Sequence, residues 1–358
     1  MTGGIGMIDR NTLLALRMER MHITAPAGSE EYDELFRDLS PVSTAGWVEP
    51  GTPPSLPGHV AFDDLSWNAS RRSTRRIRKG RFGGRIAYVD ERDWELFASL
   101  YQKPIDRPTA SQNEMLELLI REGPLNIGLI KETTGLLVKT ITPTLHRLQE
   151  AFLVYEDQVD RDGDRGWYAM QCEFPELNLD RYSKQQALEA VLPRLCRRMV
   201  WLTADAAHEF YSQPIALVRS AMASLAASGQ LIPFTMEERE GYVLSQDFPL
   251  LQQVNPAAPA RRVLALQRND PLVRCLTKAE KTALSGGQEA LYYLLIDGRI
   301  CGAVCGRFKF GPHVLEDVVL DLKQAETLSR REEILEAVYA VFDRAASPLQ
   351  RFCGEALF

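Results

Sequence analysis

The chain has 358 residues and a net charge of −6, and 45% of its residues are hydrophobic and 25% charged, which is typical of a globular protein of about two to four domains. It has no apolar run long enough to cross a bilayer and no secretory signal pattern, and its six cysteines are too dispersed for a disulfide framework. These features argue against a membrane or secreted protein and predict a reduced, cytoplasmic one. Because CxxC pairs are absent and the five histidines are scattered singly, we expect no metal site and no cofactor.

The first hundred residues predict a mainly helical region interrupted by an irregular stretch. Helices are expected over 10–21, 29–39 and 91–102, a Pro- and Gly-rich loop or edge strand over 40–64, and a short strand over 84–90.

The segment 71–85, "RRSTRRIRKGRFGGR", holds eight Lys and Arg residues and no acid, so the rest of the chain is more negative than the whole. A solvated flexible loop would account for it, but a like-charged cluster without local acids favours contact with a polyanion. The candidate phosphate-binding residues of this segment are Arg71, Arg72, Arg75, Arg76, Arg78, Lys79 and Arg81.

Residues 108–180 predict a winged helix-turn-helix: three helices, of which the second is closed by Gly135, and then a β-hairpin over 152–171. The third helix, in "TITPTLHRLQEAFLVYE", has an apolar back of Ile141, Leu145 and Leu148. Its opposite side is polar and would lie in a DNA major groove or on phosphates. The candidate DNA contacts on that side are Lys139, Thr142, His146 and Arg147.

The predicted wing of this module is acidic. It carries Asp157, Asp160, Asp162 and Asp164, which would repel phosphate, so this wing is not expected to lie on the DNA backbone.

Residues 181–250 repeat the order of three helices and a hairpin, which predicts a second winged helix. The outward face of its third helix, with Gln213, Ala216, Ser220 and Ser224, is nearly uncharged. A module kept for shape and packing is therefore at least as well supported there as base recognition.

Residues 260–358 predict a small mixed sheet or partial barrel, covered on both faces, and a terminal helix over 329–346. The fold class is thus α+β, with tandem winged helices followed by a β-barrel-like sheet. Arg307, Lys309 and His313 lie beside a turn of this sheet and are further candidate DNA contacts.

Known catalytic motifs are missing: the sequence contains no GxxxxGK[ST], HExxH, GxSxG or HxE…PCxxC pattern. The acid pairs Asp63-Asp64 and Glu316-Asp317 are weak candidates, because neighbouring side chains on a strand point to opposite faces.

The order of modules resembles the bacterial alkylpurine and crosslink-repair DNA glycosylases, which are built from tandem winged helices and a C-terminal β-barrel. The resemblance rests on "GPLNIGLIKETTGLLVKTITPTLHRLQEAFLVYED", "VSTAGWVEPGTPPSLPGHVAFDD" and "LIDGRICGAVCGRFKFGPHVLEDVVLDL". It implies a further, degenerate winged helix in residues 1–107, followed by domains 108–180, 181–250 and 260–358. It also implies double-stranded DNA as the partner, a nucleoid-associated location, and excision of alkylated or crosslinked bases.

Those glycosylases orient a water molecule with a Gln-x-Gln or Gln-x-Asp motif, and in this chain the two positions fall on Ser43 and Ala45. Alanine cannot position or activate water, and serine is a poor substitute for an amide or carboxylate. The resemblance therefore carries over the scaffold and leaves the catalytic residue unknown, with Asp63 or Asp64 as possible replacements.

Two other classes of function remain open: a non-catalytic transcription regulator, and a protein-interaction scaffold whose winged helices never meet DNA. The DNA-binding interpretation predicts that the cations of the basic segment and the helix around Lys139 and Arg147 share one concave side. It also predicts that neutralising Arg75, Arg76, Arg78 and Lys79 weakens duplex binding.

Overall fold

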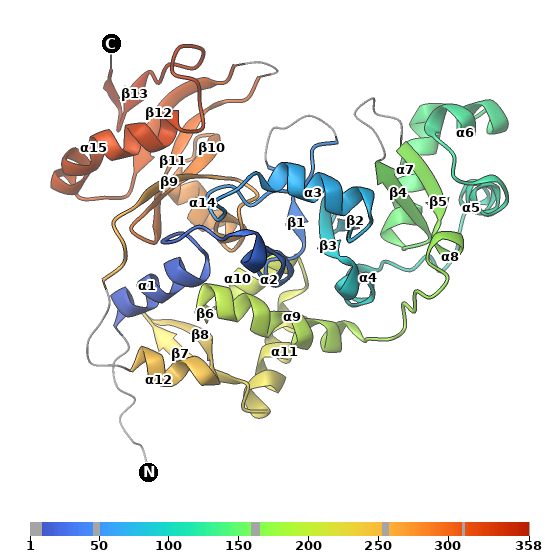
Figure 1. The fold of residues 1–358 in the computed structure, drawn as a ribbon, viewed down its shortest axis with the longest axis horizontal. Coiled ribbons are helices and arrows are strands. Elements are labelled where there is room, and N and C mark those ends of the chain that lie inside the picture. Colours follow the sequence, from blue (N-terminus) through green and yellow to red (C-terminus); the bar gives the residue numbers. More distant parts are fainter. Residues whose placement is uncertain (1–8, 46–50, 159–164, 253–257, 310–311, 358) are drawn as a thin grey trace.

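The computed structural model describes residues 9–45, 51–158, 165–252, 258–309 and 312–357 and has a mixed α+β fold (Figure 1). Within these ranges none of the helices is long and apolar enough to span a membrane. The described residues also form no cluster of three or more His, Cys, Asp or Glu side chains arranged to hold a metal ion.

The N-terminal region forms a three-stranded antiparallel sheet surrounded by helices. Its elements are α1 (Arg10–Arg20), α2 (Ser29–Asp38), β1 (Val42–Ser43), α3 (Asp64–Ser73), β2 (Ile77–Phe82), β3 (Arg85–Asp90), η1 (Glu91–Asp93) and α4 (Trp94–Tyr101). The sheet order is β1-β3-β2, with Tyr88 opposite both Val42 and Lys79.

The basic segment is regular structure and not the flexible loop that its charge suggested. It forms the end of α3, strand β2 and the turn into β3. Ile77 and Phe82 point into the core from β2, and Gly83 and Gly84, both at positive φ, close a two-residue hairpin turn of the kind that suits twisted strands.

Residues 110–169 form three helices and a two-stranded hairpin, in the predicted order. The elements are α5 (Ala110–Glu122), α6 (Ile127–Thr134), α7 (Val138–Glu150), β4 (Val154–Gln158) and β5 (Arg165–Ala169), followed by α8 (Met170–Glu173). Gly135, at φ 71°, ends α6 in the left-handed conformation, as expected of a C-cap glycine. Ile141, Leu145 and Trp167 belong to a core of this region alone.

Residues 184–251 form a second set of helices around a small sheet. The elements are α9 (Lys184–Met199), β6 (Trp201–Leu202), α10 (Ala204–Tyr211), α11 (Ile215–Ala227), β7 (Leu231–Met236), β8 (Arg239–Leu244), η2 (Ser245–Asp247) and α12 (Phe248–Leu251). Helix α9 packs against α1, α2 and α4, so this region and the N-terminal region share one hydrophobic core.

The C-terminal region is a six-stranded sheet of order β14-β13-β12-β11-β10-β9. Its elements are β9 (Val263–Gln267), α13 (Pro271–Arg274), α14 (Lys278–Leu284), β10 (Ala290–Ile296), β11 (Arg299–Arg307), β12 (Val314–Leu320), α15 (Gln324–Tyr339), β13 (Arg351–Phe352) and β14 (Glu355–Ala356). The described strands pair as an open sheet and not as a closed barrel, with one parallel pair, β12–β13.

Both faces of this sheet are covered, as its apolar central strands predicted. One face packs on Ile334 and Val338 of α15, and the other faces the large central core through Leu295, Ala303 and Cys305 (Figure 1).

Candidate nucleic-acid interface

The basic segment joins the N-terminal region to the 110–169 region through ion pairs. Arg75 pairs with Asp157, at 2.9 Å between Nη2 and Oδ2, and with Glu173. Lys79 pairs with Glu156 at 3.0 Å, and the two side chains are 4% and 1% exposed. The acids that this segment lacks locally therefore come from β4 and α8, far along the chain.

Glu156 receives two cations, since Arg165 Nη1 also lies 2.9 Å from it. Burial alone would raise the pKa of Glu156, but Lys79 and Arg165 outweigh burial and hold that pKa below its ordinary value. The negative charge of Glu156, on the strand that leads into the predicted acidic wing, is thus neutralised by cations of the same chain. The wing acids Asp160, Asp162 and Asp164 lie outside the described residues.

Aromatic rings also lie at this contact between the N-terminal region and the 110–169 region. Arg75 lies over the rings of Tyr168 and Tyr155, and Arg78 lies 4.3 Å from the ring centroid of Phe174 and 6.0 Å from that of Trp94. Burial lowers the pKa of Arg78, as expected for a guanidinium placed among rings. These two cations face the protein interior more than the solvent.

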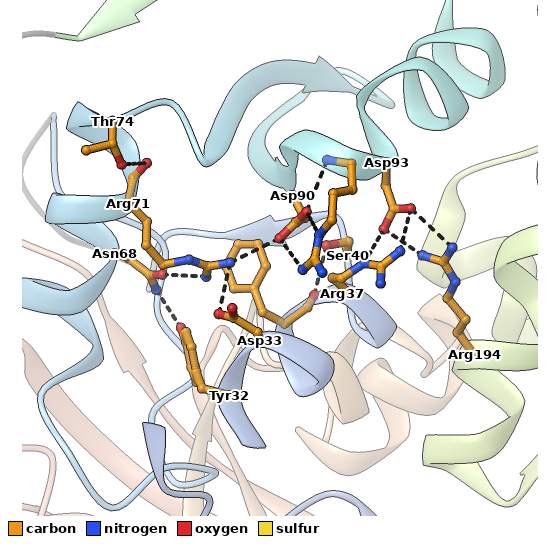
Figure 2. Close-up of polar contacts among 12 residues, drawn as sticks. Tyr32, Asp33, Arg37, Ser40, Asn68, Arg71, Thr74, Asp90, Asp93 and Arg194 are labelled. Carbon is orange, nitrogen blue, oxygen red and sulfur yellow. Dashed lines mark hydrogen bonds and ion pairs between the residues drawn. The ribbon is translucent and has the colours of Figure 1, made fainter. Parts of the chain in front are cut away.

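Arg71 belongs to a polar network that ties α2, α3, η1 and α9 together (Figure 2). Its guanidinium lies 3.2 Å from Asp33, Asp90 and the side-chain oxygen of Asn68, and it is 7% exposed. A neighbouring carboxylate, that of Asp93, accepts from Arg37 and from Arg194 of α9.

The remaining cations of the segment differ in how firmly they are held. Arg72 donates to the carbonyl of Gly51 at 2.6 Å, and Arg81 donates to the Gln149 side chain at 3.3 Å. Arg76 is exposed. Most of this segment is therefore committed to contacts inside the protein.

The polar front of α7 is covered at its C-terminal end and open at its N-terminal end. Arg147 donates to the carbonyls of Lys103 and Pro104, at 2.9 and 2.8 Å, and so fixes the chain that enters α5. His146 is half-buried beside Trp167, and burial lowers its pKa. Thr142 is half-buried, whereas Lys139 in the first turn is exposed.

The turn after β11 is also partly internal. Arg307 pairs with Glu316 at 2.7 Å, and His313 lies between the rings of Phe308 and Phe342. Lys309 is exposed and precedes residues 310–311, which lie outside the described residues. The candidate DNA contacts that the sequence suggested therefore lie at separate places in the structure: in the basic segment, on α7 and after β11.

A cavity of about 750 Å³ lies where β1, the β2–β3 turn, α10, α14 and β10 converge. Its lining is Thr44, Ala45, Arg85, Glu209, Arg268, Asn269, Val273, Lys278, Lys281, Thr282, Ser285, Gln288, Glu289, Ala290 and Tyr293. The cavity thus includes Ala45, one of the two positions that the sequence analysis aligned with the Gln-x-Gln or Gln-x-Asp motif.

The two aligned positions, Ser43 and Ala45, offer no carboxylate or amide to the cavity. Ser43 is buried in β1 opposite Ala87, and the carbonyl of Thr44 accepts from the Asn269 side chain at 3.0 Å. Ala45 contributes only a methyl group to the wall.

The proposed replacements, Asp63 and Asp64, are structural. Asp64 is buried and accepts from the Ser55 hydroxyl, the Leu56 amide and the Tyr32 hydroxyl, and Asp63 caps α3 by accepting from the Ser66 amide. Neither lines the cavity. Of the other pair, Glu316 is held by Arg307 and the buried Asp317 accepts from the Gly354 amide.

The cavity has an excess of positive charge: four cations, Arg85, Arg268, Lys278 and Lys281, face two carboxylates, Glu209 and Glu289. Arg85, Lys278 and Lys281 make no ion pair with any other described residue. Burial lowers the pKa of Lys281, Glu209 opposes that change, and Arg85 adds to it. Unpaired cations around a cavity concentrate positive potential there.

Sequence reasoning missed Glu209, Lys278, Lys281 and Glu289, because no local motif marks them. They come from α10, α14 and the loop before β10, and only the tertiary fold brings them to the Thr44–Ala45 position.

The fold is similar to that of a solved DNA glycosylase. Superposition on the Streptomyces sahachiroi DNA glycosylase AlkZ gives a TM-score of 0.66, with 14% sequence identity, and covers 96% of this chain and 97% of that chain. A scan against models of protein families and a search of curated proteins both found no match. The resemblance predicted from the sequence is thus confirmed as a similarity of fold.

Proposed function

We propose that this protein binds double-stranded DNA on a scaffold like that of AlkZ and acts in the recognition of damaged or modified bases. The observation that carries the proposal is the cation-lined cavity at Thr44 and Ala45, the position to which the family resemblance assigns the catalytic motif. A DNA backbone is the polyanion that unpaired cations at such a cavity would attract.

In this proposal residues 1–107, 108–180, 181–250 and 260–358 are the domains, and the first three are winged helices, the first of them degenerate. Arg85 and Lys278, at the cavity, contact phosphates. Lys139, in the open first turn of α7, supplies a second contact. The basic segment serves mainly to hold the 108–180 module in place, which follows from its ion pairs with Asp157, Glu173 and Glu156.

The alternative is a non-catalytic, regulatory DNA-binding protein, and Ala45 favours it because this residue cannot activate water. Both functions predict duplex binding, whereas a pure protein-interaction scaffold does not. A regulator would discriminate between undamaged sequences, and a repair protein between undamaged and modified duplexes.

The test is a titration with a fluorescent random-sequence duplex at several salt concentrations. We expect salt-dependent binding, and we expect the double variant Arg85→Met/Lys278→Met to bind about tenfold or more weakly and to lower the slope of log K against log salt by about two. The matched control is Lys184→Met/Lys323→Met, which removes two exposed lysines that do not line the cavity. Absence of duplex binding at low salt would contradict the proposal.

A further inference from the structure

The two carboxylates of the cavity are held differently. Glu209 is half-buried on α10, and the next two residues, Phe210 and Tyr211, are each 1% exposed and anchor that helix. Glu289 is exposed in the loop before β10. Glu209 is therefore the carboxylate that an anchored helix carries to the cavity, which limits its range of positions.

Lys281, on α14, lines the same cavity as Glu209, and the Glu209 carboxylate partly offsets the lowering of the Lys281 pKa by burial. The cavity also encloses Ala45, so the space vacated by the family's amide or carboxylate borders this pair. An anionic and a cationic side chain thus border the same cavity, and neither makes an ion pair with another described residue.

We propose that Glu209 and Lys281 act as an acid–base pair that hydrolyses the N-glycosidic bond of an uncharged modified base in DNA. This inference rests on the duplex binding proposed above and adds the reaction, its residues and the class of substrate.

The reaction balances with water as the only co-substrate. The Glu209 carboxylate takes a proton from a water molecule as the water oxygen bonds to C1′ of the sugar. The C1′–N bond breaks, and its electron pair leaves with the base, which takes a proton from the Lys281 ammonium. Exchange with solvent restores both side chains, and the products are the free base and an abasic site.

The charge of the cavity selects the class of base. A purine alkylated at N7 or N3 is already cationic, so it is repelled by the Lys281 ammonium and leaves without needing a proton. An uncharged base gains negative charge as the C1′–N bond breaks, and the Lys281 ammonium stabilises that charge and then neutralises it by giving its proton. The cavity therefore suits hypoxanthine or a similar neutral lesion better than N7-methylguanine.

The test uses the full chain in excess over duplexes that contain a single hypoxanthine or a single N7-methylguanine, with alkaline cleavage of abasic sites as the readout. We expect faster release of hypoxanthine. Glu209→Gln should slow that release about 100-fold or more while leaving the Kd for the duplex unchanged. Lys281→Met should slow release of hypoxanthine at least about tenfold more than release of N7-methylguanine.

Two controls separate chemistry from folding. Asp205→Asn changes an exposed acid on the same helix and should keep the wild-type rate. Glu209→Asp retains a carboxylate and should retain part of the activity, so it replaces Glu209→Gln if that variant does not melt cooperatively. Free inosine should not be hydrolysed, because it lacks the phosphates that Arg85 and Lys278 are proposed to hold.

Duplex binding without release of either base would overturn this inference and leave the proposed DNA binding intact. A wild-type rate for Glu209→Gln, or an equal effect of Lys281→Met on both bases, would also overturn it. If the wild-type protein does not bind duplex DNA at all, the proposed function on which this inference rests is itself wrong.

Discussion

Two regions of this protein are rich in cations, and they use them in opposite ways. In the basic segment Arg71, Arg75 and Lys79 meet carboxylates of the same chain, with Lys79 and Glu156 almost fully buried. Around the cavity Lys278 and Arg85, the last residue of the basic segment, are exposed and make no ion pair with the other described residues. Charge density along a sequence therefore indicates where cations are, but the fold decides which of them remain available to a ligand.

The largest expected effect comes from breaking the buried pair in the basic segment. Glu156→Gln leaves the Lys79 ammonium buried without its carboxylate, and removal of one partner of such a pair costs about 3–5 kcal/mol. Urea unfolding at neutral pH measures this cost. The double variant Lys79→Met/Glu156→Leu should recover most of the lost stability. If the double variant is as unstable as Glu156→Gln, the pairing of Lys79 with Glu156 is not the cause of the loss.

A smaller effect is expected from the cavity, because its cations are exposed. Arg85→Met/Lys278→Met should leave the free energy of unfolding within about 0.5 kcal/mol of the wild type while weakening duplex binding about tenfold or more. For Glu156→Gln, by contrast, the large effect is expected in the free energy of unfolding. If this variant instead lost stability and bound DNA as tightly as the wild type, Arg85 and Lys278 would serve to stabilise the fold, as the paired cations Arg71, Arg75 and Lys79 do.

The buried pair also predicts how stability depends on pH. Because the folded pKa of Glu156 lies below its unfolded value of 4.5, its contribution is present above pH 4.5 and is lost as the pH falls through the folded pKa. Thermal melts between pH 7 and pH 3 should show part of the acid destabilisation disappear in Glu156→Gln. An identical acid dependence in wild type and variant would show that Glu156 is not the titrating group.

The smallest effect is expected at an exposed pair. Arg121 and Glu122 are 65% and 43% exposed, and such surface pairs contribute about 0–1 kcal/mol. Arg121→Ala should therefore shift the urea midpoint by little. A loss comparable to that of Glu156→Gln would mean that burial does not determine the strength of ion pairs in this chain.

The sequence predicted the parts of the fold that depend on local pattern. The helical spacing of Ile141, Leu145 and Leu148 gave α7 its buried face, and Gly135 ended α6 as expected. The apolar run around Val304 predicted a strand covered on both faces.

The errors arose where distant residues decide the outcome. Strand β2 resembled a loop because its buried residues Ile77 and Phe82 are separated by charged ones, of which Lys79 finds its acid, Glu156, on β4. Glu209 and Lys281 reach the same cavity only through the tertiary fold, which no local motif records.

The central claim is that duplex DNA meets Arg85 and Lys278 at the cavity and not the other cations of the basic segment, those of residues 71–81. The most direct test compares the salt dependence of duplex binding for Arg85→Met/Lys278→Met with that for Arg72→Met/Arg81→Met, which also removes two cations but from groups bonded to neutral partners. We predict that the slope of log K against log salt falls by about two in the first variant and stays at the wild-type value in the second. A lower slope only in the Arg72→Met/Arg81→Met variant would contradict the account.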